Sequence, residues 1–331
     1  MTDSKEIFTQ WFGRGLEIED CDPSLYLQNY FFDRFEYNTE QRLWISWIYG
    51  TTYFWPTSYV VWNEFPDMEL VGLERLRDWN NTNYKRLRYQ TDTKWNKGHL
   101  PAQFESYRDY VGDRTQHEAL TANFVGDPVK DFYTLWDTVN TWHKFGRYTT
   151  WFYIQTLKQT CGIDVDVDSL WFHDRNGSKS HRNGMCYAMD KPEWVDSKKN
   201  NVKLDATQID FLEANGREIL QEVKLRYPHV ADKADFFAME TSLCSFKKLY
   251  RRSRGRYLGF YIDRQAEEIK KAEADNWEGI DWTPLWDARK ESLESKWLLD
   301  TVDPDLYNLF LDTGNFEPED RTVGGLEAFF V

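Results

Sequence analysis

Apolar side chains recur every three to four positions along most of the chain, which is the spacing of an amphipathic helix. The segment 24–36 places Tyr30 and Phe31 on this pattern, and 207–226 follows it from Thr207, which we predict to be the N-cap. No set of segments alternates between apolar and polar positions as strands do. We therefore predict an all-α fold, a multi-helix globular domain. Further helices are expected over residues 39–50, 57–65, 68–79, 102–111, 129–142, 147–160, 235–251, 256–276 and 304–312.

Composition indicates a globular protein, since aromatic residues make up 17% of the 331 residues. The chain carries 41 Lys and Arg against 55 Asp and Glu, a net charge of −14, so its surface as a whole does not attract polyanions. The negative charge is concentrated in residues 265–331, which hold 6 basic and 17 acidic residues. We predict a helical domain over 1–264 and an acidic helical C-terminal extension over 265–331.

Several classes of protein are disfavoured by missing motifs. No apolar run reaches the length of about 18 residues that a bilayer span needs, so we expect a cytoplasmic protein with no membrane partner. The four cysteines form no Cys-x-x-Cys pair, and the motifs of phosphate-loop kinases, zinc deaminases and metalloproteases are absent. Residues 164–168 imitate the start of a calcium loop, but Ser169 and Arg175 replace its glycine and glutamate. We expect no metal ion and no cofactor.

A glycine turn, a helix-length segment and a carboxylate cluster follow one another in residues 145–168. The turn contains Gly146 and Arg147, and the cluster contains Asp166 and Asp168. This order resembles, in spacing, the hairpin and catalytic aspartate of helix-hairpin-helix DNA glycosylases, in which backbone N–H groups at a helix start bind a DNA phosphate. The alternative is an ordinary helix start followed by solvated aspartates.

Two glycines bracket a polar loop in residues 174–184. The segment holds Lys179, His181, Arg182 and Asn183, so it combines flexible backbone with cations and a titratable imidazole. This composition predicts a site that stabilises an oxyanion or a phosphate. The alternative is a polar, exposed turn, because turns also collect glycine, asparagine and serine.

Two basic stretches have the size that phosphate contacts require. Residues 75–99 hold seven cations, and residues 247–256 hold six cations without an acid. A third stretch, 37–65, is rich in aromatic residues that could stack on a base, although most are expected to pack in the core. The alternative for the second basic stretch is a solvated helix face. The residues proposed to contact DNA phosphates are Lys94, Lys97, Arg251, Arg252 and Arg254.

Five motifs together resemble those of a known family. They are Arg-x-Trp-x-x-Trp-x-Tyr-Gly-x-Thr-Tyr (42–53), Asn-Glu-Phe-Pro-Asp (63–67), Tyr-Gln-Thr-Asp-Thr-Lys-Trp-Asn-Lys-Gly (89–98), Gly-Ser-Lys-Ser-His-Arg-Asn-Gly (177–184) and Tyr-x-Asp-Arg (261–264). Together they are similar to phage amino acid:DNA transferases, also described as α-glutamyl/putrescinyl thymine pyrophosphorylases. The resemblance covers roughly residues 25–265 and implies a distant relation to helix-hairpin-helix DNA glycosylases.

The resemblance implies a transferase of thymine hypermodification in DNA. Its partners would be a free amino acid and DNA that contains a phosphorylated 5-hydroxymethyluracil base, whose phosphate or pyrophosphate the amino acid replaces. The domain 1–264 would then be catalytic, with its basic patches on DNA, and the compartment would be the host cytoplasm for a phage-encoded protein. The alternatives are a helix-hairpin-helix-like DNA glycosylase and a non-catalytic helical protein that binds nucleic acid or a partner.

On this basis we predict roles for individual residues. Lys179, His181 and Arg182 would stabilise the departing charge, and Asp166, Asp168 or Asp263 would deprotonate or orient the nucleophile. Arg42 and Arg264 would bind the carboxylate of the amino acid, because a guanidinium can hold it in bidentate geometry. The remaining predicted substrate-binding residues are Tyr53, Arg147, Asn183 and Tyr261.

Overall fold

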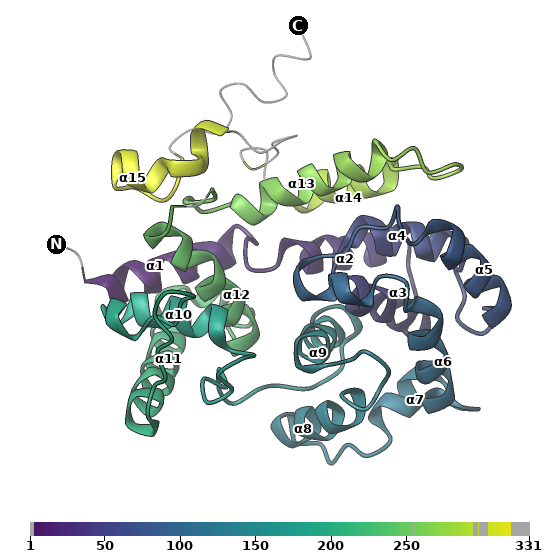
Figure 1. Cartoon of the computed structure of the whole chain (residues 1–331), viewed down its shortest axis with the longest axis horizontal. Coiled ribbons are helices and arrows are strands. Elements are labelled where there is room, and N and C mark those ends of the chain that lie inside the picture. Colours follow the sequence, from purple (N-terminus) through teal and green to yellow (C-terminus); the bar gives the residue numbers. More distant parts are fainter. Residues whose placement is uncertain (1–2, 253, 294–296, 298–303, 319–331) are drawn as a thin grey trace, which may run out of the picture. The chain divides into compact units, whose positions relative to one another are not determined.

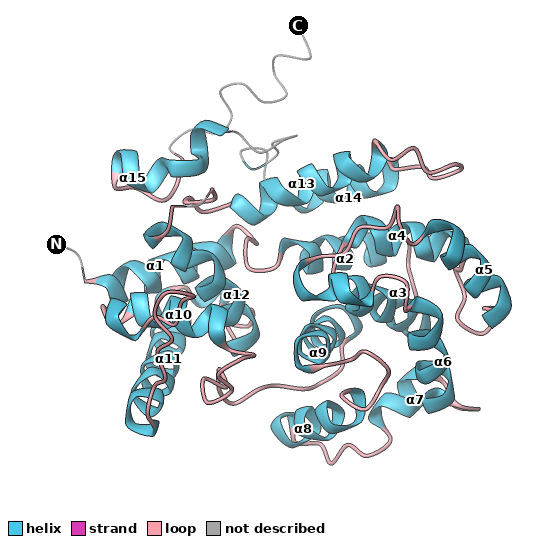
Figure 2. Ribbon diagram, viewed as in Figure 1, coloured by secondary structure: helices cyan, strands magenta, loops and turns pink. Residues whose placement is uncertain are grey.

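The computed structural model describes residues 3–252, 254–293, 297 and 304–318. Within these ranges the chain forms helices joined by loops, and no strand is present (Figure 2). The prediction of an all-α fold is therefore confirmed. Figure 1 shows the order of the helices along the chain.

The chain forms two compact units, each assembled from separate parts of the sequence. Unit 1 contains residues 1–23, 167–267 and 293–331, and unit 2 contains residues 24–166 and 268–292. Each unit is described separately below. The boundary that we predict at residue 264 remains a prediction, and 294–296, 298–303 and 319–331 of the predicted acidic extension lie outside the described residues.

Unit 2 is built around helix α3, which packs against α4 and α9. Its core is aromatic: Trp151 is fully buried, and so are Trp47 and Trp55, as expected for most aromatic residues of segment 37–65. Gly50 lets α3 approach α9 closely, because a Cβ atom there would lie 2.7 Å from the ring of Tyr153. The helices are α2 (Pro23–Arg34), α3 (Thr39–Thr52), α4 (Trp55–Glu64), α5 (Leu73–Asn83), η1 (Thr91–Asn96), α6 (Leu100–Val111), α7 (Gln116–Thr121), α8 (Pro128–Val139), α9 (Arg147–Cys161), the last part of α13 (Phe260–Glu273), and α14 (Thr283–Ser292).

Unit 1 is built around the contact between α10 and α12, with α1 packed on both and on α11. Its core includes the fully buried side chains of Phe8, Phe12 and Trp11. The helices are α1 (Ser4–Glu17), α10 (Lys179–Ala188), η2 (Pro192–Trp194), α11 (Ala206–Arg226), η3 (Pro228–Val230), α12 (Phe236–Phe246), η4 (Lys247–Tyr250), the first part of α13, η6 (Pro304–Asn308) and α15 (Leu309–Thr313).

Capping residues set several helix starts. Asp205 begins α11, where its side chain accepts the N–H of Gln208 and the Gln208 side chain accepts the N–H of Asp205. The predicted N-cap at Thr207 is therefore wrong by two residues, because the aspartate satisfies the first free N–H groups of the helix earlier in the chain.

Four helices lie where the sequence pattern predicted none: α1, α7, α10 and α14. For α10 the correction matters most, because residues 174–184 were expected to form a loop. The chain does turn at 174–178, but from Lys179 it is helical. Among the described residues, no helix is both long enough and apolar enough to cross a membrane.

Candidate active site

Gly184 on α10 allows this helix to pack closely against α12 in unit 1. A Cβ atom at this position would lie 2.2 Å from the carbonyl oxygen of Leu243 on α12. Only glycine allows the two backbones to come this close. The approach brings His181 and Ser180 of α10 next to Glu240 and Cys244 of α12.

The imidazole of His181 is completely buried between these helices. Its Nε2 lies 2.9 Å from the backbone oxygen of Leu170, and its Nδ1 lies 2.9 Å from Oε1 of Glu240. A carbonyl oxygen can only accept, so Nε2 carries the proton and Nδ1 faces the carboxylate. The sequence identified His181 as a functional candidate but did not reveal Glu240 as its neighbour.

Cys244 and Ser180 extend this group of side chains. The Sγ atom of Cys244 lies 3.1 Å from Oγ of Ser180 and 3.6 Å from Oε1 of Glu240. Lys247, at the start of η4, donates to the same Ser180 hydroxyl. Burial raises the pKa of the Cys244 thiol to about 12, so the isolated thiol is neutral at pH 7. We call Ser180, His181, Glu240, Cys244, Lys247 and Lys248 the polar centre of unit 1.

Lys248 is the most unusual member of the polar centre. Its Nζ atom is enclosed and has no hydrogen-bond partner in the described part of the chain. It lies 4.0 Å from the ring centre of Tyr261 and 4.3 Å from that of Phe260, so aromatic faces replace much of its hydration. Burial, assisted by the charge of Arg264, lowers the pKa of Lys248 to about 7. Near neutral pH this amine can therefore accept a proton.

Three predicted residues lie at the start of α13, and two of them, Tyr261 and Arg264, are close to Lys248. Tyr261 forms the ring contact, and the charges of Arg264 and Lys248 interact. Asp263 is completely buried and accepts a hydrogen bond of 2.7 Å from the hydroxyl of Tyr257. Burial raises the pKa of the Tyr261 hydroxyl. The structure thus brings Tyr261, Asp263 and Arg264 to one end of a helix beside the polar centre.

Asp20 holds this end of α13 in place. One carboxylate oxygen accepts the backbone N–H groups of Tyr261 and Ile262 at 2.9 and 3.1 Å, and the other accepts that of Gly259 at 3.0 Å. These donors are the free N–H groups of the helix start. Burial raises the pKa of Asp20 to about 7, against the opposing effect of the N–H groups.

We expect Asp20→Asn to lower the free energy of unfolding by about 1–3 kcal/mol, because the amide NH₂ would leave at least one of these buried N–H groups without an acceptor. Urea unfolding measures the change. Asp127→Asn is the matched control: Asp127 caps α8 at an exposed position, where asparagine caps equally well. Equal stability of the Asp20 variant and the wild type would contradict this anchoring role.

Lys179, Arg182 and Asn183 face a different neighbour, Asp196. Asn183 bonds to the backbone of Asp196 in both directions, and Lys179 forms an ion pair of 3.2 Å with its carboxylate. The buried guanidinium of Arg182 donates to the carbonyl oxygens of Phe172 and Arg175. The expectation of a flexible loop is thus wrong for these residues: Arg182 and Asn183 hold the start of α10 against the preceding turn.

The two aspartates of segment 164–168 belong to different units. Asp166 is in unit 2, where Lys158 forms an ion pair of 3.0 Å with it. Asp168 is exposed and is among the first residues of this part of unit 1. The buried carboxylate nearby is one that the sequence did not single out: Glu213 of α11 accepts the N–H groups of Leu170 and Phe172.

Among the other predicted residues of unit 2, Arg147 and Tyr53 lie against aromatic rings of α9, and Arg42 lies on α3. Gly146 is the N-cap of α9, with Arg147 5.0 Å from the ring centre of Trp151, and Tyr53 packs its ring 4.2 Å from that of Phe152. Arg42 forms an ion pair of 2.7 Å with Asp33 and donates to the backbone oxygen of Tyr37.

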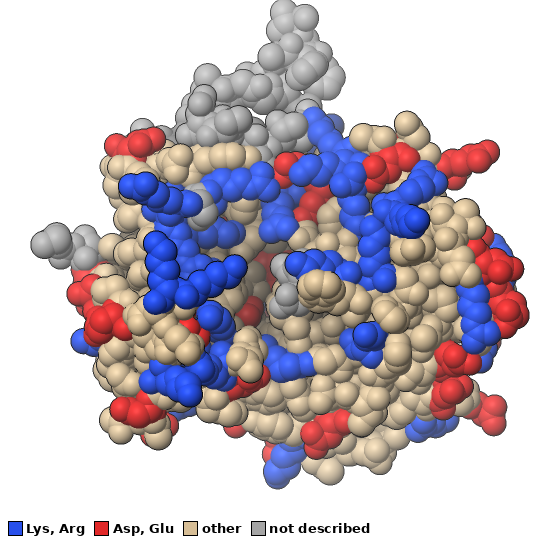
Figure 3. Space-filling model, viewed as in Figure 1, with Lys and Arg blue, Asp and Glu red and all other residues tan. Residues whose placement is uncertain are grey.

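The predicted phosphate-binding residues lie in both units. In unit 2, Lys94 and Lys97 form no ion pair with a described residue, and Lys94 lies beside the exposed ring of Trp95. In unit 1, the same holds for Arg251 and Arg252, whereas Arg254 is 3.8 Å from Glu267. Figure 3 shows Lys and Arg side chains gathered over α10 and α12. The unpaired cations are thus available for phosphates.

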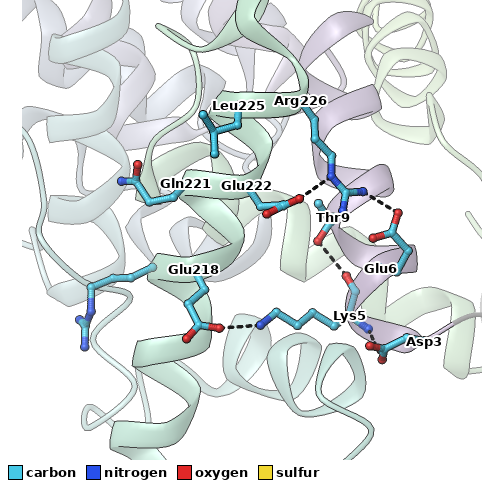
Figure 4. A pocket seen from close by; sticks show the side chains of 10 residues that line it. Asp3, Lys5, Glu6, Thr9, Glu218, Gln221, Glu222, Leu225 and Arg226 are labelled. Atoms are coloured by element: carbon cyan, nitrogen blue, oxygen red, sulfur yellow. Dashed lines mark hydrogen bonds and ion pairs between the residues drawn. The ribbon is translucent and has the colours of Figure 1, made fainter.

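A groove of about 590 Å³ lies between α1 and α11 of unit 1 (Figure 4). Its charges neutralise one another, since Lys5 pairs with Glu218, and Arg226 pairs with both Glu6 and Glu222. Because these side chains already have partners, we place no substrate there.

Comparison with known proteins agrees with the motifs. Residues 20–256 match the family model described as amino acid:DNA transferase. A serinyltransferase of Salmonella phage ViI is 30% identical over 275 residues, which are 80% of this chain and 65% of that relative. The chain therefore belongs to the amino acid:DNA transferase family, and it spans about two thirds of the length of this relative. No solved structure matches the chain.

Sequence reasoning missed Lys248, Glu240, Cys244 and Asp20. Glu240 and Cys244 stand four residues apart, which places both on one face of a helix, and this spacing is a signal that could have paired them. Lys248 was counted only as one cation of a basic run. Nothing in the sequence indicates that Asp20 caps a helix about 240 residues further along the chain.

Proposed function

We propose that this protein transfers an amino acid to an activated thymine-like base in DNA. Family membership and the name of the serinyltransferase support this function. The observation on which we base the location of the active site is the polar centre of unit 1. It contains an enclosed amine, Lys248, and the chain continues within four residues to Arg251 and Arg252, which form no ion pair with a described residue.

The proposed substrate is DNA that contains a phosphorylated 5-hydroxymethyluracil base. The amine or hydroxyl of the amino acid attacks the 5-methylene carbon, a C–N or C–O bond forms, and the C–O bond to the phosphate or pyrophosphate breaks. The nucleophile loses a proton, and the leaving group departs with the bonding electron pair. A site for this reaction needs a proton acceptor near the nucleophile and positive charge near the leaving group.

Residues of the polar centre meet both needs. Lys248 is our first choice as proton acceptor, with Asp263 as the alternative, because each is enclosed beside the start of α13. Lys247, His181 and the more exposed Lys179 supply positive or hydrogen-bonding groups for the leaving group. Arg182 and Asn183 act indirectly, by holding α10 in position.

The carboxylate of the amino acid is assigned to Arg264, beside Tyr261. Roles for Arg42, Tyr53, Arg147, Asp166 and Asp168 in substrate binding or catalysis remain proposals. We also propose, from the phage relative, that the protein acts in the cytoplasm of a host cell.

The arginines after η4 are proposed to bind DNA phosphates. Arg252→Ala is expected to reduce the slope of log affinity against log salt concentration by about 0.9 on duplex DNA, because one fewer counterion is released. Arg217→Ala, which removes an equally exposed charge from α11, is the control and should leave the slope unchanged. DNA-binding titrations at several salt concentrations measure these slopes. Identical slopes for both variants and the wild type would remove Arg252 from the proposed DNA interface.

A DNA glycosylase is the second candidate, favoured by the completely buried carboxylate of Asp263, which follows the basic run 247–256 by seven residues in the chain. The two activities release different products. A transferase liberates phosphate or pyrophosphate from the activated DNA only when an amino acid is present, and the strand survives alkali. A glycosylase leaves an abasic site that alkali cleaves, without any amino acid. Strand cleavage in the absence of an amino acid would therefore replace our proposal with the second candidate.

A further inference from the structure

Three side chains of the polar centre have the chemistry and spacing of metal ligands. One ligand atom each of His181, Glu240 and Cys244 lies within 4.8 Å of the other two. Glu240 and Cys244 are four residues apart on α12, so they share one face, and His181 approaches that face from α10. The close helix contact at Gly184 fixes this arrangement.

The orientation of the His181 imidazole also supports a metal site. Its Nε2–H donates to the carbonyl oxygen of Leu170, which leaves Nδ1 directed at the space beside Glu240. Nδ1 is buried and has no hydrogen-bond partner among the described residues, although Oε1 of Glu240 is only 2.9 Å away, because with the proton on Nε2 the Nδ1 atom has no hydrogen to donate to the carboxylate. Metal-bound histidines are typically fixed in this manner, by a second nitrogen that donates to a backbone carbonyl.

The distances between the ligand atoms match a single small cation. Bonds of about 2.0–2.3 Å in a tetrahedron place ligand atoms roughly 3.3–3.7 Å apart. The separations here are 2.9 Å between Nδ1 and Oε1 and 3.6 Å between Oε1 and Sγ, so small side-chain movements suffice. One nitrogen, one oxygen and one sulfur ligand suit zinc, and three protein ligands leave the fourth position open.

We propose that His181, Glu240 and Cys244 bind one divalent transition-metal ion of the zinc class, with water or substrate as the fourth ligand. The absence of paired cysteines and of metalloenzyme motifs led us to expect no metal, but such motifs describe ligands that are close in sequence. Here α10 supplies one ligand and α12 supplies two. The site shares His181 with the proposed transfer, but its test is independent of that function, since metal binding is measured without DNA or amino acid.

Cobalt titration tests the site, because Co²⁺ replaces Zn²⁺ and a cobalt–thiolate bond gives a charge-transfer absorption band. The full-length protein, treated with chelator, is expected to bind one equivalent of Co²⁺ and to show this band. Cys244→Ser should lose the band. Cys161→Ser, which alters a cysteine of unit 2 bonded to Ser46, should keep it.

Absence of the band from the wild type at one equivalent, or a band of equal strength in Cys244→Ser, would overturn the proposal. Should Cys244→Ser lose its helical circular dichroism, Glu240→Gln takes its place. This variant is expected to raise the Kd for cobalt at least tenfold. Mutating a residue that only supports a metal ligand typically weakens metal binding 10–100-fold, and removing the ligand itself weakens it at least as much. An unchanged Kd would contradict the site.

Discussion

Replacing Lys248 with methionine is expected to lower the rate of amino acid transfer by about 100-fold or more, which is the usual contribution of a general base. Methionine has a similar length and suits the aromatic surroundings of Phe260 and Tyr261, so the fold should persist. Lys248→Arg should lose as much activity, because a guanidinium keeps the charge but cannot accept a proton. Single-turnover formation of the modified base measures both rates.

The pH dependence separates this catalytic role from a structural one. Because burial lowers the pKa of Lys248 to about 7, the amine is protonated below that pH and neutral above it. The wild-type rate should therefore rise with pH and level off above about 7, and the rise should be absent from the residual activity of the Lys248 variants. Lys224→Met on α11 serves as control. A Lys248→Met enzyme with the wild-type rate and pH profile would contradict the assignment.

Gly184→Val is expected to destabilise unit 1 by about 3 kcal/mol or more, although glycine is otherwise unfavourable within a helix. The reason is that a Cβ at this position meets the backbone of Leu243 at 2.2 Å, and backbone cannot move aside as a flexible side chain can. The two helices must separate, which also parts His181 from Glu240 and Cys244.

Thermal unfolding followed by circular dichroism measures this effect, and a fall of roughly 6–12 °C in the midpoint corresponds to that loss of stability. The matched control is Gly146→Val: no atom lies within 4 Å of its added Cβ, and its φ of −80° suits any residue. A midpoint that falls equally for both variants would mean that the close contact of α10 and α12 does not govern stability.

The sequence predicted those helices that carry one apolar face. Helix α11 is an example, because Leu212, Ile219 and Val223 lie on its buried side, whereas residues such as Arg217 and Glu218 are exposed. Helix α10 was missed since its first half is polar and glycine-bearing, features that are typical of turns. Its buried polar side chains bond to Leu170, Phe172 and Asp196, which no local pattern reveals.

The candidate site was predicted in part. His181, Tyr261, Asp263 and Arg264 were selected from their sequence context. All four lie in unit 1, with Tyr261 and Arg264 close to Lys248, and their functional roles stay predictions. Lys248 could not be selected, because its proposed role depends on burial and on the lack of a hydrogen-bond partner among the described residues, neither of which composition records. The same applies to the two units, since each is assembled from segments far apart in the chain.

Mass spectrometry of nucleosides tests the central claim most directly. DNA with a phosphorylated 5-hydroxymethyluracil base is incubated with the protein and a mixture of amino acids, then digested to nucleosides. The account predicts a thymidine derivative that has gained one amino acid and lost its phosphate or pyrophosphate, with little product from the Lys248→Met variant. Unchanged nucleosides under these conditions, or the same product from DNA without the phosphate, would contradict it.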